Sequence, residues 1–162
     1  MISSRLNNPS IYYQILLFFS FSISINYFVE LKYVNLIFYI FFHITFIYIC
    51  FYYFHYYLFF VAFIYGISFD LILINNIAPH LLTFLFLLVF ISLLRKRLFY
   101  LKQNRISIII LLFLLIILFF EMFIASVFFN YSIQFDLISK FIIISLIIFL
   151  PAFYFFSKLD NL

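Results

Sequence analysis

The sequence predicts an all-α integral membrane protein with about six transmembrane helices. Of its 162 residues, 70% are hydrophobic and 9% are charged, whereas a soluble domain is about half apolar and a quarter charged. A domain of this size keeps much of its surface outside the core, so the excess apolar surface must face lipid. Uninterrupted apolar runs, such as residues 106–120, favour helices over a barrel, whose strands alternate polar and apolar residues.

Six apolar segments have roughly the 17–24 residues that are needed to cross about 30 Å of hydrocarbon. The predicted spans are residues 11–29, 34–52, 58–74, 79–94, 106–129 and 137–156. Together they form a single transmembrane domain over residues 1–162. A cleavable signal peptide is the rival interpretation of the first span, but no small-x-small cleavage site precedes a soluble domain.

Polar or interfacial residues separate the predicted spans. Glu30 and Lys32 mark the first loop, and the tyrosine-rich segment 52–57 predicts a turn at the membrane interface, where tyrosines concentrate. Residues 75–76, both Asn, end the third span, and Pro79 begins the fourth. Proline suits the first turn of a helix, because its missing N–H would be unpaired there in any case.

The main charge cluster of the chain predicts its topology. The cluster consists of Arg95, Lys96, Arg97, Lys102 and Arg105. By the positive-inside rule this segment is cytoplasmic, and six spans then place both termini in the cytoplasm. Of the nine basic residues, only Lys32 and Lys140 lie outside on this topology. Because topology accounts for the basic residues, the net charge of +4 does not indicate a nucleic-acid partner.

Two acids inside the predicted spans, Asp70 and Glu121, are candidates for function, because ionisable groups are costly in a membrane. If the third and fifth spans are neighbours, the two acids share one site. In one interpretation, this site binds a cation or a proton. In the other, one acid stays protonated and hydrogen-bonds a neighbouring helix. Gly66 lies four residues before Asp70 on the same helix face and predicts a close helix contact. His80 is expected to reach back toward Asp70 or Asn76.

Motifs of soluble and intramembrane enzymes are missing from the sequence. A single glycine excludes every glycine-rich loop, and no nucleophile elbow or zinc-protease motif is present. His43 and His55 show neither an obvious partner nor motif spacing, so we expect no partner and no site at either. The lone Cys50 behaves as a small hydrophobe. The sequence therefore predicts no catalysis, no cofactor and no metal site. The excess of Phe and Tyr matches A/T-rich codon usage, so it marks no site.

The stretch from Gly66 to Arg97, GISFDLILINNIAPHLLTFLFLLVFISLLRKR, resembles the signature region of the rod shape-determining protein MreD family. That family has Gly-x-x-x-Asp-Leu at the end of one span, a short loop, a small residue, and a His or basic residue before an apolar span with a basic end. Gly66, Asp70 and Leu71 match. Ala78 stands where the family usually has glycine, and His80 occupies the His or basic position. Arg95–Arg97 form the basic end, and Pro151 matches the family's late proline.

The resemblance implies a non-catalytic subunit of the bacterial cell-elongation complex in the inner membrane. Such a protein binds MreC through its membrane region and connects MreB filaments to the wall synthases that make lateral peptidoglycan. Gly66, Asp70, Ala78, Pro79 and His80 would shape the hairpin that holds the fold or a partner helix. The basic loop would meet anionic lipids or MreB, and lipid contact alone accounts for it.

An alternative is the substrate-binding membrane subunit of an energy-coupling-factor vitamin transporter, whose fold the MreD family is thought to share. That function needs a polar cavity on the outer face, which Asn26, Asp70 and Glu121 could line. The spans are bulky and leave little room for a ligand. Another small membrane protein, including an intramembrane enzyme, is the third possibility.

Overall fold

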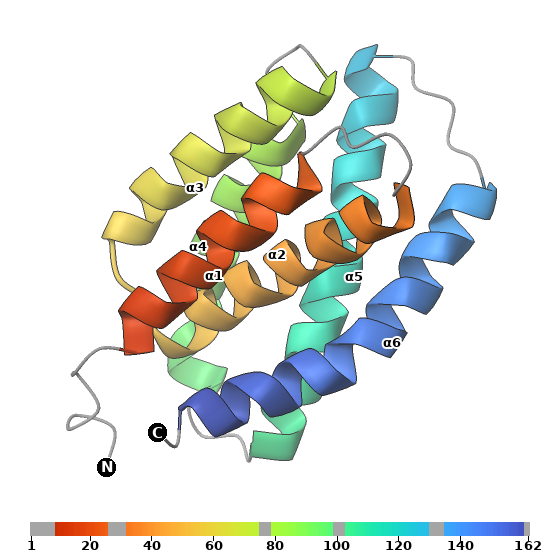
Figure 1. Ribbon diagram of the computed structural model, residues 1–162. Coiled ribbons are helices and arrows are strands. Elements are labelled where there is room, and N and C mark those ends of the chain that lie inside the picture. Colours follow the sequence, from red (N-terminus) through yellow and green to blue (C-terminus); the bar gives the residue numbers. More distant parts are fainter. Residues whose placement is uncertain (1–8, 26–31, 75–78, 99–102, 130–134, 161–162) are drawn as a thin grey trace.

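The computed structural model describes residues 9–25, 32–74, 79–98, 103–129 and 135–160 (Figure 1). These residues form six α-helices and one π-helical stretch, with no strand among them. The helices are α1 (Pro9–Ser24), α2 (Lys32–Tyr52), α3 (Tyr57–Phe69), α4 (Pro79–Leu98), α5 (Gln103–Phe129) and α6 (Phe135–Leu159). The π-helical stretch η1 (Asp70–Ile74) continues α3 directly. The all-helical prediction is confirmed.

Four of the helices are long and apolar enough to cross a membrane. Their apolar parts are Tyr33–Tyr52, Tyr57–Ile74, Arg105–Phe129 and Ile138–Leu159. The apolar parts of α1 (Ile11–Ser24) and α4 (Pro79–Leu94) are shorter than the roughly 17 residues that a spanning helix needs. In α1 the helix ends at Ser24, and residues 26–29 of the predicted first span lie outside the described residues.

Helix α2 is the centre of the bundle. It packs against α1, α4, α5 and α6, and Figure 1 shows it running between α1 and α5. Every residue from 42 to 51 is buried, so this part of α2 is covered on all sides. A helix that is apolar all round is buried within a bundle or a membrane. The other helices therefore arrange themselves around α2.

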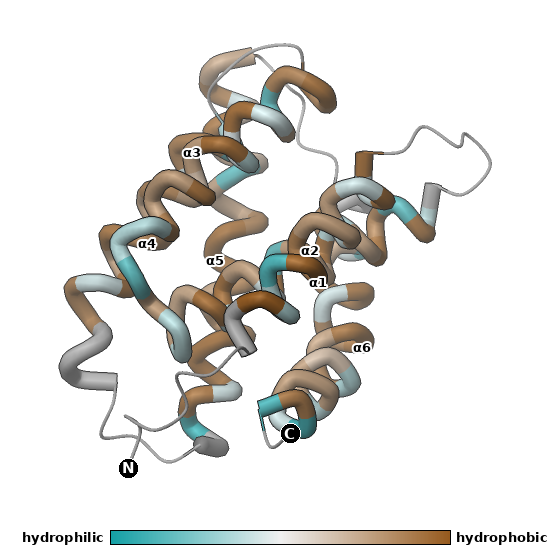
Figure 2. The backbone as a smooth tube through the Cα atoms, turned by 60° about the vertical axis from the view of Figure 1, so that its left-hand side comes forward, coloured by the Kyte–Doolittle hydropathy of each residue, from teal (hydrophilic) through white to brown (hydrophobic). Residues whose placement is uncertain are grey.

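Aromatic rings fill the space between α2, α3 and α4. Phe42 lies 5.0 Å from Phe69 and 5.9 Å from Phe84, measured between ring centroids. Phe46 lies 5.1 Å from the same Phe84 ring. Offset and edge-to-face pairs of this kind contribute about 0.5–1.5 kcal/mol each beyond the area that they bury. Other rings face outward, as Phe18 and Phe60 do, and Figure 2 shows apolar residues along all the helices that it labels.

The α3–α4 hairpin is closed by backbone contact at Gly66. A Cβ atom added to this buried glycine would lie 2.6 Å from the Cα of Leu81 in the first turn of α4. No side chain fits at that distance without a shift of backbone. The close helix contact predicted from Gly66 is confirmed.

We therefore expect Gly66→Ala to destabilise the protein by about 1–3 kcal/mol, the usual cost of overpacking. The measurement is the thermal unfolding midpoint of the purified protein in detergent. Ser68→Ala is the control, because the Ser68 hydroxyl donates to the Ile64 carbonyl of its own helix. An unchanged midpoint for Gly66→Ala would show that α3 and α4 are not in backbone contact.

Candidate functional site

Asp70 is fully buried at the point where α3 widens into the π-helical stretch η1. Its Oδ1 accepts the backbone N–H of His80 at 2.9 Å, and its Oδ2 accepts that of Leu81 at 3.1 Å. These N–H groups belong to the first turn of α4, where a helix has no internal acceptors for them. The negative carboxylate also suits the positive end of the helix dipole. Asp70 thus caps α4 from the end of the preceding helix.

His80 extends this cap toward the centre of the bundle. Its Nδ1 lies 2.8 Å from Asp70 Oδ1, and its Nε2 lies 2.9 Å from the hydroxyl of Tyr39 on α2. The ring is buried and stacks on Phe69 with a centroid separation of 5.3 Å. The contact between His80 and Asp70 that the sequence predicts is therefore present.

Glu121 of α5 completes the network on the other side of Tyr39. The Tyr39 hydroxyl donates to Glu121 Oε2 at 2.6 Å. The second carboxylate oxygen, Oε1, lies 2.9 Å from Nε2 of His43. Nδ1 of His43 lies 2.8 Å from the Tyr39 carbonyl oxygen, one turn earlier on α2. The polar network, as we call Tyr39, His43, Asp70, His80 and Glu121, therefore joins α2, α4 and α5 to the end of α3.

The two acids of the predicted spans lie in one network, as the sequence allowed, and they are joined through His80 and Tyr39. The expectation that His43 has no partner is wrong, because His43 pairs with Glu121. The signal that was missed is the spacing of Tyr39 and His43, four residues apart and hence on one face of α2. Motif spacing alone does not show such a pair, since its partner is 78 residues away.

The other residues that the sequence analysis singled out differ in burial, and some of them are not described. Pro79 is buried at the first position of α4, as expected. Arg105 is exposed near the start of α5. Arg95, Lys96 and Arg97 continue α4, but their side chains, together with Ala78 and Lys102, lie outside the described residues. His55 is exposed in the short α2–α3 connection.

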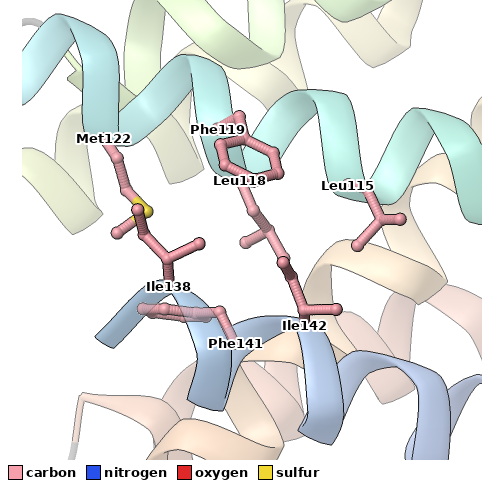
Figure 3. Close-up of a pocket in the computed structure, with 7 residues that line it drawn as sticks. All are labelled: Leu115, Leu118, Phe119, Met122, Ile138, Phe141 and Ile142. Atoms are coloured by element: carbon pink, nitrogen blue, oxygen red, sulfur yellow. The ribbon is translucent and has the colours of Figure 1, made fainter. Parts of the chain in front are cut away.

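A small hollow between α5 and α6 is entirely apolar (Figure 3). It is lined by Leu115, Leu118, Phe119, Met122, Ile138, Phe141 and Ile142. Its cavity volume of about 10 Å³ is near the minimum for one water molecule. The hollow therefore has neither the size nor the polar groups that would orient a vitamin-sized ligand. Among the residues that the structure describes, no three His, Cys, Asp or Glu side chains form a metal-binding group.

A second polar cluster closes the opposite end of the bundle around Asp160. Its carboxylate accepts the hydroxyl of Tyr13 on α1 at 2.7 Å, and also those of Tyr48 on α2 and Tyr53 just after it. The Tyr13 ring lies 5.3–5.5 Å from the rings of Tyr48 and Tyr53. This tyrosine cluster joins α1, α2 and α6, and sequence patterns gave no sign of it.

No known family model matches this chain, and no curated protein or solved structure matches it either.

The tyrosine cluster predicts a clear contrast between two adjacent tyrosines. Tyr13→Phe should lower the free energy of unfolding by about 1.5–3 kcal/mol, the usual value of a hydrogen bond to a charged group. Tyr12→Phe should leave it unchanged, because Tyr12 is 59% exposed. Thermal unfolding of both variants in detergent checks this. Equal midpoints would show that Asp160 does not hold α1 in place.

Proposed function

We propose that this chain is a non-catalytic, multi-pass scaffold subunit of the bacterial cell-elongation complex, similar to MreD, which binds MreC through its membrane region. The observation that carries the proposal is the α3–α4 hairpin. Gly66, Asp70 and His80, which carry the resemblance to that family, meet in one compact unit. Gly66 lets the backbones touch at Leu81, and Asp70 holds the first turn of α4.

A structural role suits this hairpin better than catalysis does. The side chain of Asp70 is 0% exposed and that of His80 is 6% exposed. A catalytic acid or base must come within hydrogen-bond reach of its substrate. Here the carboxylate and the imidazole are occupied by the backbone of α4 and by Tyr39. The polar groups therefore hold helices together, which is what a scaffold requires.

The proposed topology has six spans with both termini on the cytoplasmic side of the inner membrane. The tyrosine cluster supports it, because the start of α1, the end of α2 and the end of α6 meet at Asp160. Helices that alternate in direction across a membrane bring these three ends to one side. The short apolar part of α4 is followed by Arg95, Lys96 and Arg97, whose long side chains can extend to the lipid headgroups.

Apolar side chains on the outer faces of the helices are available to lipid or to the transmembrane segment of a partner. Phe60 and Phe63 on α3 are 68% and 48% exposed, and Leu150 on α6 is 72% exposed. In a membrane, a partner helix is held by packing and by hydrogen bonds, so the shape of this surface matters. A hairpin fixed by Gly66 and Asp70 presents a surface of constant shape.

Asp70→Ala should reduce the amount of MreC that co-purifies with the tagged protein from detergent-solubilised membranes. The substitution leaves His80 and two N–H groups of α4 without their acceptor, which costs about 1–3 kcal/mol for each unsatisfied group. The hairpin then loses its fixed geometry. We expect several-fold less MreC per molecule of bait, measured by mass spectrometry, and rounder cells when the variant complements a deletion.

His55→Gln is the control, since His55 is exposed in the α2–α3 connection and lies 15 residues before Asp70 in the chain. Normalising MreC to the recovered bait separates weaker binding from a lower protein level. Unchanged recovery and unchanged cell shape for Asp70→Ala would overturn the assignment. Recovery of an ATPase pair with a coupling subunit by the wild-type protein would replace the scaffold function with the transporter alternative.

A further inference from the structure

The exposed tyrosines are confined to the ends of the helices, whereas the exposed phenylalanines are not. Among the residues whose burial the structure describes, every exposed tyrosine lies within two turns of a helix end. These tyrosines are Tyr12, Tyr33, Tyr56, Tyr57 and Tyr154. Exposed phenylalanines also occur in the middle of helices, as Phe19, Phe63 and Phe119 do. The two side chains differ by one hydroxyl group, so the outer surface separates them by that group alone.

Codon usage does not produce this separation. Phe and Tyr codons are equally rich in A and T, so a bias in the gene raises both without regard to position. Tyrosines deeper in α2 and α3 pack against rings of other elements, since Tyr39 contacts Phe69 and Tyr65 contacts Phe21. On the lipid-facing middle of a span, a tyrosine hydroxyl would have no partner in the hydrocarbon, which is costly. The position of the exposed tyrosines therefore reflects their surroundings.

Four of the five exposed tyrosines lie at the end of the bundle that Asp160 closes. Tyr12 is in the first turn of α1 and Tyr154 is in the last two turns of α6, and these helix ends meet at Asp160 (Figure 1). The Tyr57 hydroxyl accepts a hydrogen bond from Gln14 Nε2 at 3.2 Å, which joins the start of α3 to the start of α1. The tyrosine rim, as we call this group, consists of Tyr12, Tyr56, Tyr57 and Tyr154.

The exposed side chains of α6 change in the order that a membrane boundary requires. Leu150, Tyr154 and Lys158 follow one another at intervals of four residues, hence on one face, and all three are exposed. Each step is about 6 Å along the helix axis. On α1, Phe19 and Tyr12 show the same change from apolar to hydroxyl-bearing toward the same end of the bundle. Hydrocarbon, headgroups and water follow one another in this order at the surface of a bilayer.

The fifth exposed tyrosine, Tyr33, lies at the opposite end of the bundle. The apolar part of α2 runs from Tyr33 to Tyr52 and has 20 residues, so it is about 30 Å long. The hydrocarbon core of a bilayer has the same thickness. Tyr52 is followed in the chain by the rim residues Tyr56 and Tyr57. The exposed tyrosines therefore lie at two levels that are one hydrocarbon thickness apart.

Basic side chains accompany the tyrosine rim. Lys158 and Arg105 are both exposed. Phe113, about two turns after Arg105 on α5, contacts Phe51 at the end of α2, so the start of α5 lies at this end of the bundle. The carboxylate of Asp160 is engaged with three tyrosine hydroxyls of the tyrosine cluster. Basic residues beside a membrane surface attract anionic lipids, so the charge at this end matches a phosphate-bearing headgroup.

We propose that the tyrosine rim, together with Lys158, is a binding surface for the headgroups of anionic phospholipids. The tyrosine hydroxyls donate hydrogen bonds to phosphate and ester oxygens, and the rings lie beside the first carbons of the acyl chains. The ammonium group of Lys158 pairs with the phosphate. The rim thereby fixes the depth of the bundle in one leaflet. The inference rests on the multi-pass placement in the proposed function but not on MreC.

Single tryptophans measure the depth of the rim. The chain has no tryptophan, so each replacement introduces one reporter. Tyr12→Trp and Tyr154→Trp report the rim, and Phe19→Trp and Ile147→Trp are matched controls, since these exposed positions lie two turns away on the same helix faces. In vesicles of phosphatidylglycerol and phosphatidylcholine, a nitroxide on the headgroup should quench the rim reporters more strongly than a nitroxide in the middle of the acyl chain. The controls should show the reverse.

Each contrary outcome has a distinct meaning. Stronger quenching of the rim reporters by the mid-chain nitroxide would place the rim in hydrocarbon and overturn the proposal. Quenching of these reporters by aqueous acrylamide alone would overturn it too, because the rim would then lie in water, where a soluble protein could cover it. If neither nitroxide quenches the control reporters, the multi-pass placement itself is wrong, and the proposed function fails with it.

The preference for anionic headgroups is measured in the Tyr154→Trp protein. Brominated phosphatidylglycerol should quench this reporter at a several-fold lower mole fraction than brominated phosphatidylcholine does. Lys158→Gln should reduce the preference about fivefold, the factor for one basic residue near an anionic surface. Lys140→Gln, at an exposed position near the opposite end of the same helix, should leave it unchanged. Equal quenching by the two lipids, or a preference that Lys158→Gln does not lower, would contradict the proposal.

Discussion

Lipid as a solvent is the constraint on which this fold depends. An apolar side chain gains little by leaving hydrocarbon for a protein interior, so close packing and interhelical hydrogen bonds decide which helices meet. Small residues are scarce here, with a single glycine in the chain. The few polar side chains therefore determine the arrangement. The polar network holds α2, α4 and α5 to the end of α3, and the tyrosine cluster holds α1, α2 and α6. Only α2 takes part in both.

The acids of the tyrosine cluster and of the polar network have different surroundings. Asp160 is partly exposed and accepts hydrogen bonds from hydroxyl groups. Asp70 and Glu121 are buried and face histidines instead. An acid at the end of a span can rely on phenols and headgroups, whereas an acid inside it needs hydrogen-bonding partners from neighbouring helices. The positions of the three histidines follow this rule, because only His55 is exposed.

Local sequence patterns predicted the helices and the α3–α4 hairpin. They did not predict side-chain contacts between residues that are far apart in the sequence. Long apolar runs placed all six helices within a few residues at most described ends, since span length is fixed by membrane thickness. Asp70 and His80 are ten residues apart in the chain, so their contact follows from the hairpin. Glu121 and His43 are 78 residues apart, and Tyr13 and Asp160 are 147 apart. Hydropathy does not say which helices are neighbours, and the π-helical stretch at Asp70 has no sequence signal of this kind.

An interior held by buried hydrogen bonds and by backbone contact also explains how so apolar a surface is compatible with a specific role. The side chains that fix the helix arrangement point inward, and the outward faces of α3 and α6 carry bulky apolar groups. Lipid and a partner helix compete for such faces on nearly equal terms, because both offer hydrocarbon. A partner helix therefore binds better than lipid only where the surface keeps a constant shape, because flexible lipid tails gain nothing from that constancy. The backbone contact at Gly66 and the cap from Asp70 supply that rigidity. On the proposed scaffold function, the hairpin is therefore where this apolar surface would acquire specificity for a partner helix.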